Sequence, residues 1–202
     1  MDKKNIAIIV AAIVILLSLY QFVYVPLQNE EAMKNYNEGL QNVSAINKEM
    51  NQSFAKADRV SSSNVSGGVE ATAQTFKEVQ PMIERQIEKL NETRAYANGN
   101  QTKEKYIDYQ IQAKQVEKAL ITDMIREYNE FADAYNNTDV NKMLNVSNEM
   151  QNTINSRSDE MIPIRDNIIN LLNENPDFNQ TLHQLNLSSD LYGDMDLNHV
   201  AT

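Results

Sequence analysis

The 202-residue chain has no cysteine and no tryptophan, and only two histidines. Without cysteine there is no disulfide framework, no zinc–thiolate site and no thiol nucleophile, which disfavours a small secreted eukaryotic domain. The histidines, His183 and His199, both lie near the C-terminus, and neither stands in a Glu-x-x-His or His-Glu-x-x-His pattern. The sequence therefore excludes a ferritin-like di-iron centre, supports no bound cofactor, and favours a protein that is not an enzyme.

Glycine and proline are also scarce, with five and four residues. Alternating runs of β-branched residues are nearly absent, so the sequence predicts an all-α protein. Gly67, Gly68 and Gly99 stand where helices are expected to end, whereas Gly39 interrupts a helical pattern.

One long apolar run is present, over residues 6–25, and only Ser18 and Gln21 interrupt it. Twenty helical residues cover about 30 Å, the thickness of the hydrocarbon core of a bilayer. No small-x-small cleavage site follows the run, because the residues after it are bulky. We expect an uncleaved signal-anchor helix that spans the membrane once.

Charge around this run predicts its orientation. Lys3 and Lys4 precede it, whereas Glu30 and Glu31 follow it closely. The positive-inside rule then places residues 1–5 in the cytoplasm and the rest of the chain outside. The whole chain has a formal net charge of −10, which disfavours nucleic acid as a partner. The expected partners are the membrane, other envelope proteins or a second copy of the chain.

Four long segments carry helical periodicity, and they are Gln28–Asp58, Val69–Asn98, Tyr106–Tyr135 and Val140–Leu171. The last has the clearest heptad pattern, with steps of three and four residues at Val140, Met143, Ser147, Met150, Ile154, Arg157, Met161, Ile164, Ile168 and Leu171. Short connections force neighbouring helices to run antiparallel. The sequence predicts an elongated up-down four-helix bundle over residues 26–175, with coiled-coil-like packing.

Helix ends are predicted from local signals. The segment Arg59–Gly68 is expected to be a loop, and Thr102 and Asp139 are expected to cap the third and fourth helices. Pro81 and Pro163 are expected to bend the helices that contain them or to leave a carbonyl unpaired. Residues 176–202 are expected to form a short helix followed by a loose acidic tail.

The strongest surface signal is the Asn-x-Ser/Thr acceptor for N-linked glycans, which occurs nine times. Chance pairing of 26 asparagines with 21 serines and threonines in 202 residues would give about 2.7 such sites. The acceptor asparagines are Asn42, Asn51, Asn64, Asn91, Asn100, Asn136, Asn145, Asn179 and Asn186. Only Asn51 and Asn179 have the acidic residue two positions earlier that the stricter bacterial acceptor requires, so an archaeal cell surface is the expected setting.

Polar residues interrupt two of the predicted seams: Asn47 in the first helix, and Ser147 and Arg157 in the fourth. One interpretation is a polar layer in the core that binds a small anion. The other is structural, because a single seam asparagine commonly fixes helix register and a long arginine reaches the edge of a bundle. Asp123, Glu127 and Glu130 are expected on a solvated face.

Two functions agree with these features. The first is a single-pass, N-glycosylated surface protein whose helical bundle has a structural or protein-interaction role. The alternative is an extracytoplasmic sensor or ligand-binding module. Because no second apolar run follows, such a module would signal through a partner membrane subunit.

Overall fold

The computed structural model describes residues 25–61 and 65–187, and this part of the chain is helical throughout except at short turns. The elements are α2 (Val25–Ser61), α3 (Val65–Arg94), the 3₁₀ turn η2 (Ala95–Ala97), α4 (Gln101–Asn136), α5 (Val140–Glu174) and α6 (Pro176–Gln184). The all-α prediction is confirmed. The predicted short helix near residue 178 is α6, and it begins at Pro176, a residue favoured in the first turn of a helix.

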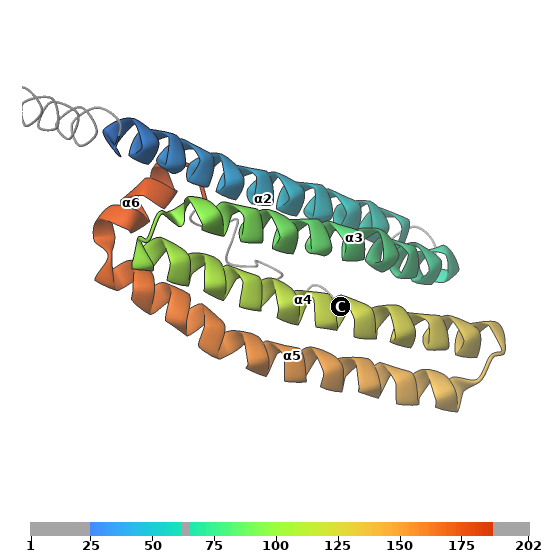
Figure 1. Cartoon of the computed structure of the whole chain (residues 1–202). Coiled ribbons are helices and arrows are strands. Elements are labelled where there is room, and N and C mark those ends of the chain that lie inside the picture. The colour runs from blue at the N-terminus through green and yellow to red at the C-terminus, as the bar shows by residue number, and fades with distance from the viewer. Residues whose placement is uncertain (1–24, 62–64, 188–202) are drawn as a thin grey trace, which may run out of the picture.

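The four long helices run antiparallel, each packed against the next along the chain (Figure 1). Helix α3 lies between α2 and α4, and α4 lies between α3 and α5. Helix α5 packs against α4 along its length and against α6 near its end. The arrangement is that of an up-down helical bundle, as the sequence predicts, with α5 as an edge helix.

The turns on either side of α4 use side chains as helix caps. The Asn100 side chain accepts a hydrogen bond from the Lys103 amide at 3.1 Å, and the Asp139 side chain accepts one from the Lys142 amide at 3.0 Å. The prediction for Asp139 is confirmed. The cap predicted at Thr102 is wrong, because Thr102 lies inside α4 and its hydroxyl donates to Asn175 at 2.9 Å instead.

Two other local predictions need correction or refinement. Gly67 and Gly68 lie in the first turns of α3, so the expected loop Arg59–Gly68 is helical on both sides of residues 62–64. Pro81 and Pro163 both lie inside long helices. Each removes one backbone donor, which leaves the carbonyl four residues earlier without its usual partner. Gly99 does end a segment, with a φ of 72° in the turn before α4.

The core consists of two clusters of buried apolar residues. The first cluster lies at the end where α2 begins and comprises Tyr36, Leu40, Val43, Leu90, Ala97, Tyr106, Ile107, Ile168, Leu171, Leu172, Leu182 and Leu187. The second comprises Met50, Phe76, Val79, Ile83, Leu120, Ile121, Met124 and Ile154. Helix α6 closes the first cluster: its Phe178 ring lies edge-on to Tyr106, with centroids 5.3 Å apart.

Among the described residues, no helix combines the length and apolarity that a membrane span requires. The predicted anchor, residues 6–25, lies outside the described residues except for Val25. The predicted cytoplasmic residues 1–5 and the acidic tail from residue 188 onward also lie outside them.

Candidate functional site

Most of the predicted glycan acceptors lie on the surface. Asn64 lies outside the described residues, and Asn179 is half-buried in α6. The other seven asparagines are exposed, and they are Asn42, Asn51, Asn91, Asn100, Asn136, Asn145 and Asn186. A glycan is bulky and hydrophilic, so these seven positions can carry one without displacing core side chains.

Several hydroxyls of the same sequons belong to the fold itself. Ser44 and Thr93 are buried, and the Thr93 hydroxyl donates to the Lys89 carbonyl at 2.6 Å. The Thr102 hydroxyl bridges α4 to Asn175. Replacing one of these threonines therefore disturbs packing. An exposed asparagine is the better target for testing the glycan, except for Asn100, whose side chain also caps α4.

The three seam residues predicted to form a polar layer do not come together. Asn47 is buried on the inner side of α2, Arg157 is half-buried beside α4, and Ser147 is exposed on α5. Ser147 is exposed because, among the described helices, the first half of α5 packs against α4 alone. The heptad pattern therefore marks a stripe that the bundle covers only in part.

A different polar layer does lie inside the bundle. It consists of buried residues placed along three helices between the two apolar clusters, and we call it the central polar layer: Ser44, Asn47, Gln86, Gln110, Lys114 and Glu117. On α4, for example, its members follow Ile107 of the first cluster and precede Leu120 of the second. The layer thus divides the core across its middle.

Lys114 and Glu117 form an ion pair in this layer. The Lys114 ammonium donates to both carboxylate oxygens of Glu117, at 3.0 and 2.8 Å, and the two side chains are 1% and 3% exposed. Removing two charges from water costs several kcal/mol per ion, and mutual attraction offsets that cost only with close geometry. The layer is therefore electrically neutral but costly to build.

Two glutamines of the layer keep unused hydrogen-bonding capacity. Gln86 donates to the Val43 carbonyl at 3.2 Å, but its own side-chain oxygen has no partner. Both the nitrogen and the oxygen of the Gln110 amide are buried without a partner. Such groups cost about 1–3 kcal/mol each unless water or a ligand satisfies them. The layer can therefore accept and donate further hydrogen bonds.

Sequence reasoning missed Gln110, Lys114 and Glu117, although a signal was present. They belong to a second stripe of α4, Ile107, Gln110, Lys114, Glu117, Ile121 and Met124, with steps of three and four residues. Helix α4 has two neighbours and buries two stripes, so polar members of the second stripe are buried as well.

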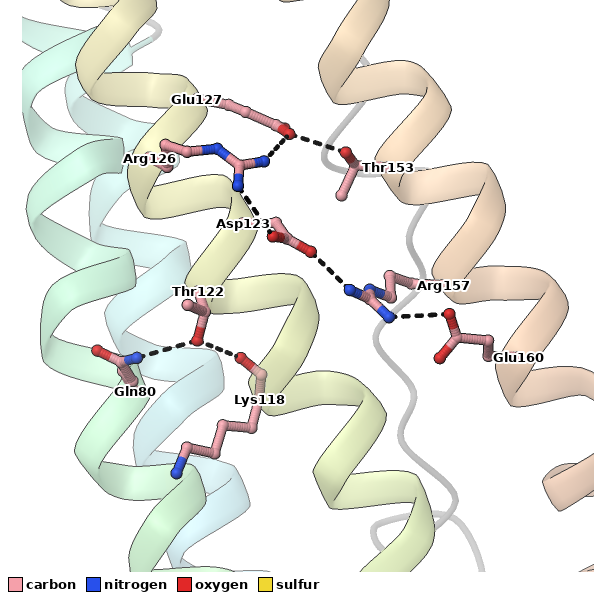
Figure 2. A network of polar contacts seen from close by, with 9 residues as sticks. All are labelled: Gln80, Lys118, Thr122, Asp123, Arg126, Glu127, Thr153, Arg157 and Glu160. Carbon is pink, nitrogen blue, oxygen red and sulfur yellow. Dashed lines mark hydrogen bonds and ion pairs between the residues drawn. The ribbon is translucent and has the colours of Figure 1, made fainter.

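A second polar network lies near the second cluster (Figure 2). Gln80 of α3 donates to Thr122 of α4 at 3.0 Å, and other side chains of α4 bind α5. Asp123 accepts from Arg157 at 2.8 Å, and this hydrogen bond is the main reason why the pKa of Arg157 is raised. Glu127 accepts from Arg126 at 3.0 Å and from Thr153 at 2.8 Å. Arg157 is thus the seam residue that joins α5 to α4.

This network corrects the expectation of a solvated acidic face. Glu127 is 2% exposed, and Asp123 and Glu130 are half-buried. One oxygen of Glu127 has no hydrogen-bond partner. Asp123 and Glu127 face α5, because each accepts a hydrogen bond from a side chain of that helix.

The end where α2 begins holds a nearly buried amine. The Lys103 nitrogen lies 3.1 Å from the Met33 sulfur and 4.8 Å from the centroid of the Tyr36 ring. The Tyr36 hydroxyl donates to the Lys103 carbonyl at 3.2 Å. Burial lowers the pKa of Lys103, and burial, with Tyr106 nearby, raises the pKa of Tyr36. A cation–π contact offsets part of the desolvation of the amine.

Within residues 25–61 and 65–187, no group of three or more His, Cys, Asp or Glu side chains is placed to hold a metal ion. Comparison of the chain with protein-family models, with curated proteins and with solved structures finds no match.

Proposed function

We propose that the chain is a single-pass membrane protein whose helical bundle lies outside the cytoplasm, carries N-linked glycans, and acts through structure or protein binding. The observation that carries this proposal is the exposure of seven of the nine acceptor asparagines. The apolar run at residues 6–25 supports it, because it ends where the described bundle begins at Val25. The favoured setting is a cell surface, with other envelope proteins or a second copy as partners.

The orientation can be tested with single cysteines, because the natural chain has none. Gln112→Cys places a thiol on an exposed position of α4, and Asn5→Cys places one before the apolar run. In intact cells a membrane-impermeant maleimide should label Gln112→Cys and leave Asn5→Cys unlabelled until lysis. Labelling of Asn5→Cys alone would indicate the opposite orientation in the membrane. Protection of both cysteines until lysis would indicate that the bundle lies inside the cell.

The glycans can be tested with a matched pair of neighbouring asparagines. Asn136 is a sequon acceptor, whereas Asn137 is not, and both are exposed at the end of α4. Intact mass spectrometry of the protein from its native membrane should show one glycan fewer for Asn136→Gln than for Asn137→Gln. A bare chain of 23.0 kDa in every variant would remove the glycoprotein part of the proposal.

The central polar layer favours a second candidate function, a ligand-binding module that signals through a partner membrane subunit. The unpartnered amide of Gln110 carries this alternative, since an amide can both donate to and accept from a small uncharged polar ligand. Native mass spectrometry should then show a small noncovalent mass on the wild-type protein that Gln110→Leu lacks. Equal masses for the two proteins would leave the layer with a structural role alone.

A further inference from the structure

Helix α5 buries much less of itself than α4, although the two are almost equal in length. Five of its 35 residues are buried, against twelve of 36 in α4. Four large apolar side chains of α5 are strongly exposed: Val140 by 58%, Leu144 by 60%, Ile162 by 55% and Ile169 by 43%. An edge helix with this much exposed apolar surface suggests a missing neighbour.

These four side chains lie on one side of the helix. At about 100° per residue, their directions fall within roughly 40° of one another. Between them the same side of the helix carries polar residues, all uncharged except Arg165. Together these positions form what we call the α5 stripe: Val140, Leu144, Ser147, Gln151, Asn155, Ser158, Ile162, Arg165 and Ile169. All of them are exposed except Ser158, which is half-buried.

The stripe is also poor in charge. Helix α5 has eight charged residues, and Arg165 is the only one on the stripe. Solvated helix faces are normally rich in charge, whereas the centres of protein interfaces are depleted of it. The composition is therefore that of a contact surface.

Apolar residues stand at both ends of the stripe, and amides and hydroxyls stand in its middle. In an antiparallel pair of stripes, the apolar ends meet at Val140 and Ile169, and the polar centres meet at Gln151, Asn155 and Ser158. We propose that the α5 stripe binds the α5 stripe of a second copy of this chain, antiparallel, around a two-fold axis near Asn155. Because this axis places the starts of the two α2 helices at opposite ends of the pair, two copies anchored in one membrane pair with their bundles lying along its surface. Val140 then faces Ile169, Ser147 faces Ile162, and Gln151 faces Ser158, while the stem of Arg165 covers Leu144.

The size of the stripe agrees with a specific but modest interface. Its 30 residues reach about 45 Å along the helix, and a strip roughly 10 Å wide offers about 450 Å² per copy. A pair buries about 900 Å² in this strip, slightly less than the ~1,000 Å² that a stable specific interface should clear, so we expect a weak dimer. Antiparallel pairing also places the amide of Asn155 beside its own symmetry mate, where each can donate to and accept from the other.

Disulfide trapping tests both the surface and the direction of pairing. In the purified full chain, Asn155→Cys places thiols near the two-fold axis, within disulfide reach. Ser147→Cys lies on the same stripe, but an antiparallel pair separates the two thiols by about 24 Å. Ser156→Cys is the matched control, exposed and adjacent in sequence but on the other side of α5. Under mild oxidation only Asn155→Cys should give the disulfide-linked dimer. Equal cross-linking of Asn155→Cys and Ser156→Cys, or stronger cross-linking of Ser147→Cys, overturns the proposal.

A second measurement does not depend on oxidation. Analytical ultracentrifugation should show wild-type dimers that return to monomers in the double variant Leu144→Glu, Ile162→Glu. Both side chains are more than half exposed, so the melting curve of the diluted monomer should not change. A wild type that stays monomeric at all concentrations overturns the proposal. A chain that dimerises only after residues 188–202 are removed also overturns the proposal, because that result would mean that this segment, and not a second copy, binds the stripe.

Discussion

At Gly39 the backbone of α2 comes close to α3. A β-carbon added there would lie 2.0 Å from the Thr93 hydroxyl oxygen and 2.9 Å from two carbons of the same side chain. Thr93 cannot easily turn away, because its hydroxyl donates to the Lys89 carbonyl and the residue is 2% exposed. Only glycine allows this approach, which explains why the residue stands inside a helical pattern.

Alanine at this position should therefore destabilise the bundle. Overpacking costs about 1–3 kcal/mol, which exceeds the roughly 1 kcal/mol that alanine gains over glycine in a helix. We expect Gly39→Ala to lower the free energy of unfolding in urea by about 1 kcal/mol. The double variant Gly39→Ala, Thr93→Ala should lose less than the two single variants together. An alanine variant more stable than wild type would show that α2 and α3 adjust freely.

The buried ion pair gives a second prediction for single residues. Glu117→Gln leaves the Lys114 ammonium buried without a counter-charge, which should cost about 3–5 kcal/mol. Replacing both residues, as Lys114→Met with Glu117→Leu, should be neutral or stabilising, because no charge is then buried. Urea unfolding at a fixed pH measures both. A loss below about 1 kcal/mol for Glu117→Gln would mean that water reaches the pair.

At the scale of elements, α5 is joined to α4 by polar contacts as well as by packing. The ion pair between Arg157 and Asp123 lies in the middle of this contact, with side chains 28% and 21% exposed. Glu127 and Thr153 add a second link one helical turn away (Figure 2). Since α5 buries few apolar residues, these polar links carry an unusual share of the attachment.

A double-mutant cycle measures that share. Arg157→Ala and Asp123→Ala should show a coupling energy of about 1–2 kcal/mol, because the pair is partly shielded and hydrogen-bonded. Arg85 and Glu49 serve as the control: this pair joins α2 to α3 at 3.5 Å, and both side chains are more than half exposed. Their coupling should lie near zero. Equal coupling in the two cycles would show that the pair of Arg157 and Asp123 adds nothing to the attachment of α5.

At the scale of the whole molecule, burial is uneven from one end to the other. The first cluster draws side chains from α2, α3, α4, α5 and α6, and α6 closes it. At the opposite end, the first eleven residues of α5, Val140–Met150, include one buried residue, Val146. Segments with few buried contacts open most easily.

Hydrogen exchange in dilute solution should show this gradient. Amides in Val140–Met150 should exchange much faster than those around Leu171 in the same helix, because local opening there exposes little apolar surface. Raising the protein concentration should slow exchange along the α5 stripe if the proposed dimer forms. Uniform protection along α5 in the monomer would contradict the uneven burial.

The positions of the buried seams were predictable to different degrees. In α2 and α3 the expected seams are buried almost throughout, as at Leu40, Val43, Val79 and Ile83. In α5 the clearest heptad pattern of the chain is buried at only a few positions. Periodicity reports which face of a helix is apolar, and it does not report whether a neighbour covers that face.

The candidate sites were also predictable from the sequence to different degrees. That the acceptor asparagines are mostly exposed could be expected, because each lies off the predicted seams. The central polar layer could not be expected in its actual composition. Lys114 and Glu117 look like an ordinary surface pair three residues apart, and only the position of α4 between two helices removes them from water.

The sequence by itself determined the helical class, the order of four long helices, the cap at Asp139 and the positions of the sequons, because these depend on local spacing and residue type. The tertiary structure decided which helices are neighbours. The choice of neighbours explains the burial of Lys114 with Glu117, the close approach of α2 to α3 at Gly39, and the exposed stripe of α5. Burial depends on contacts between residues far apart in the chain, and local periodicity does not contain that information.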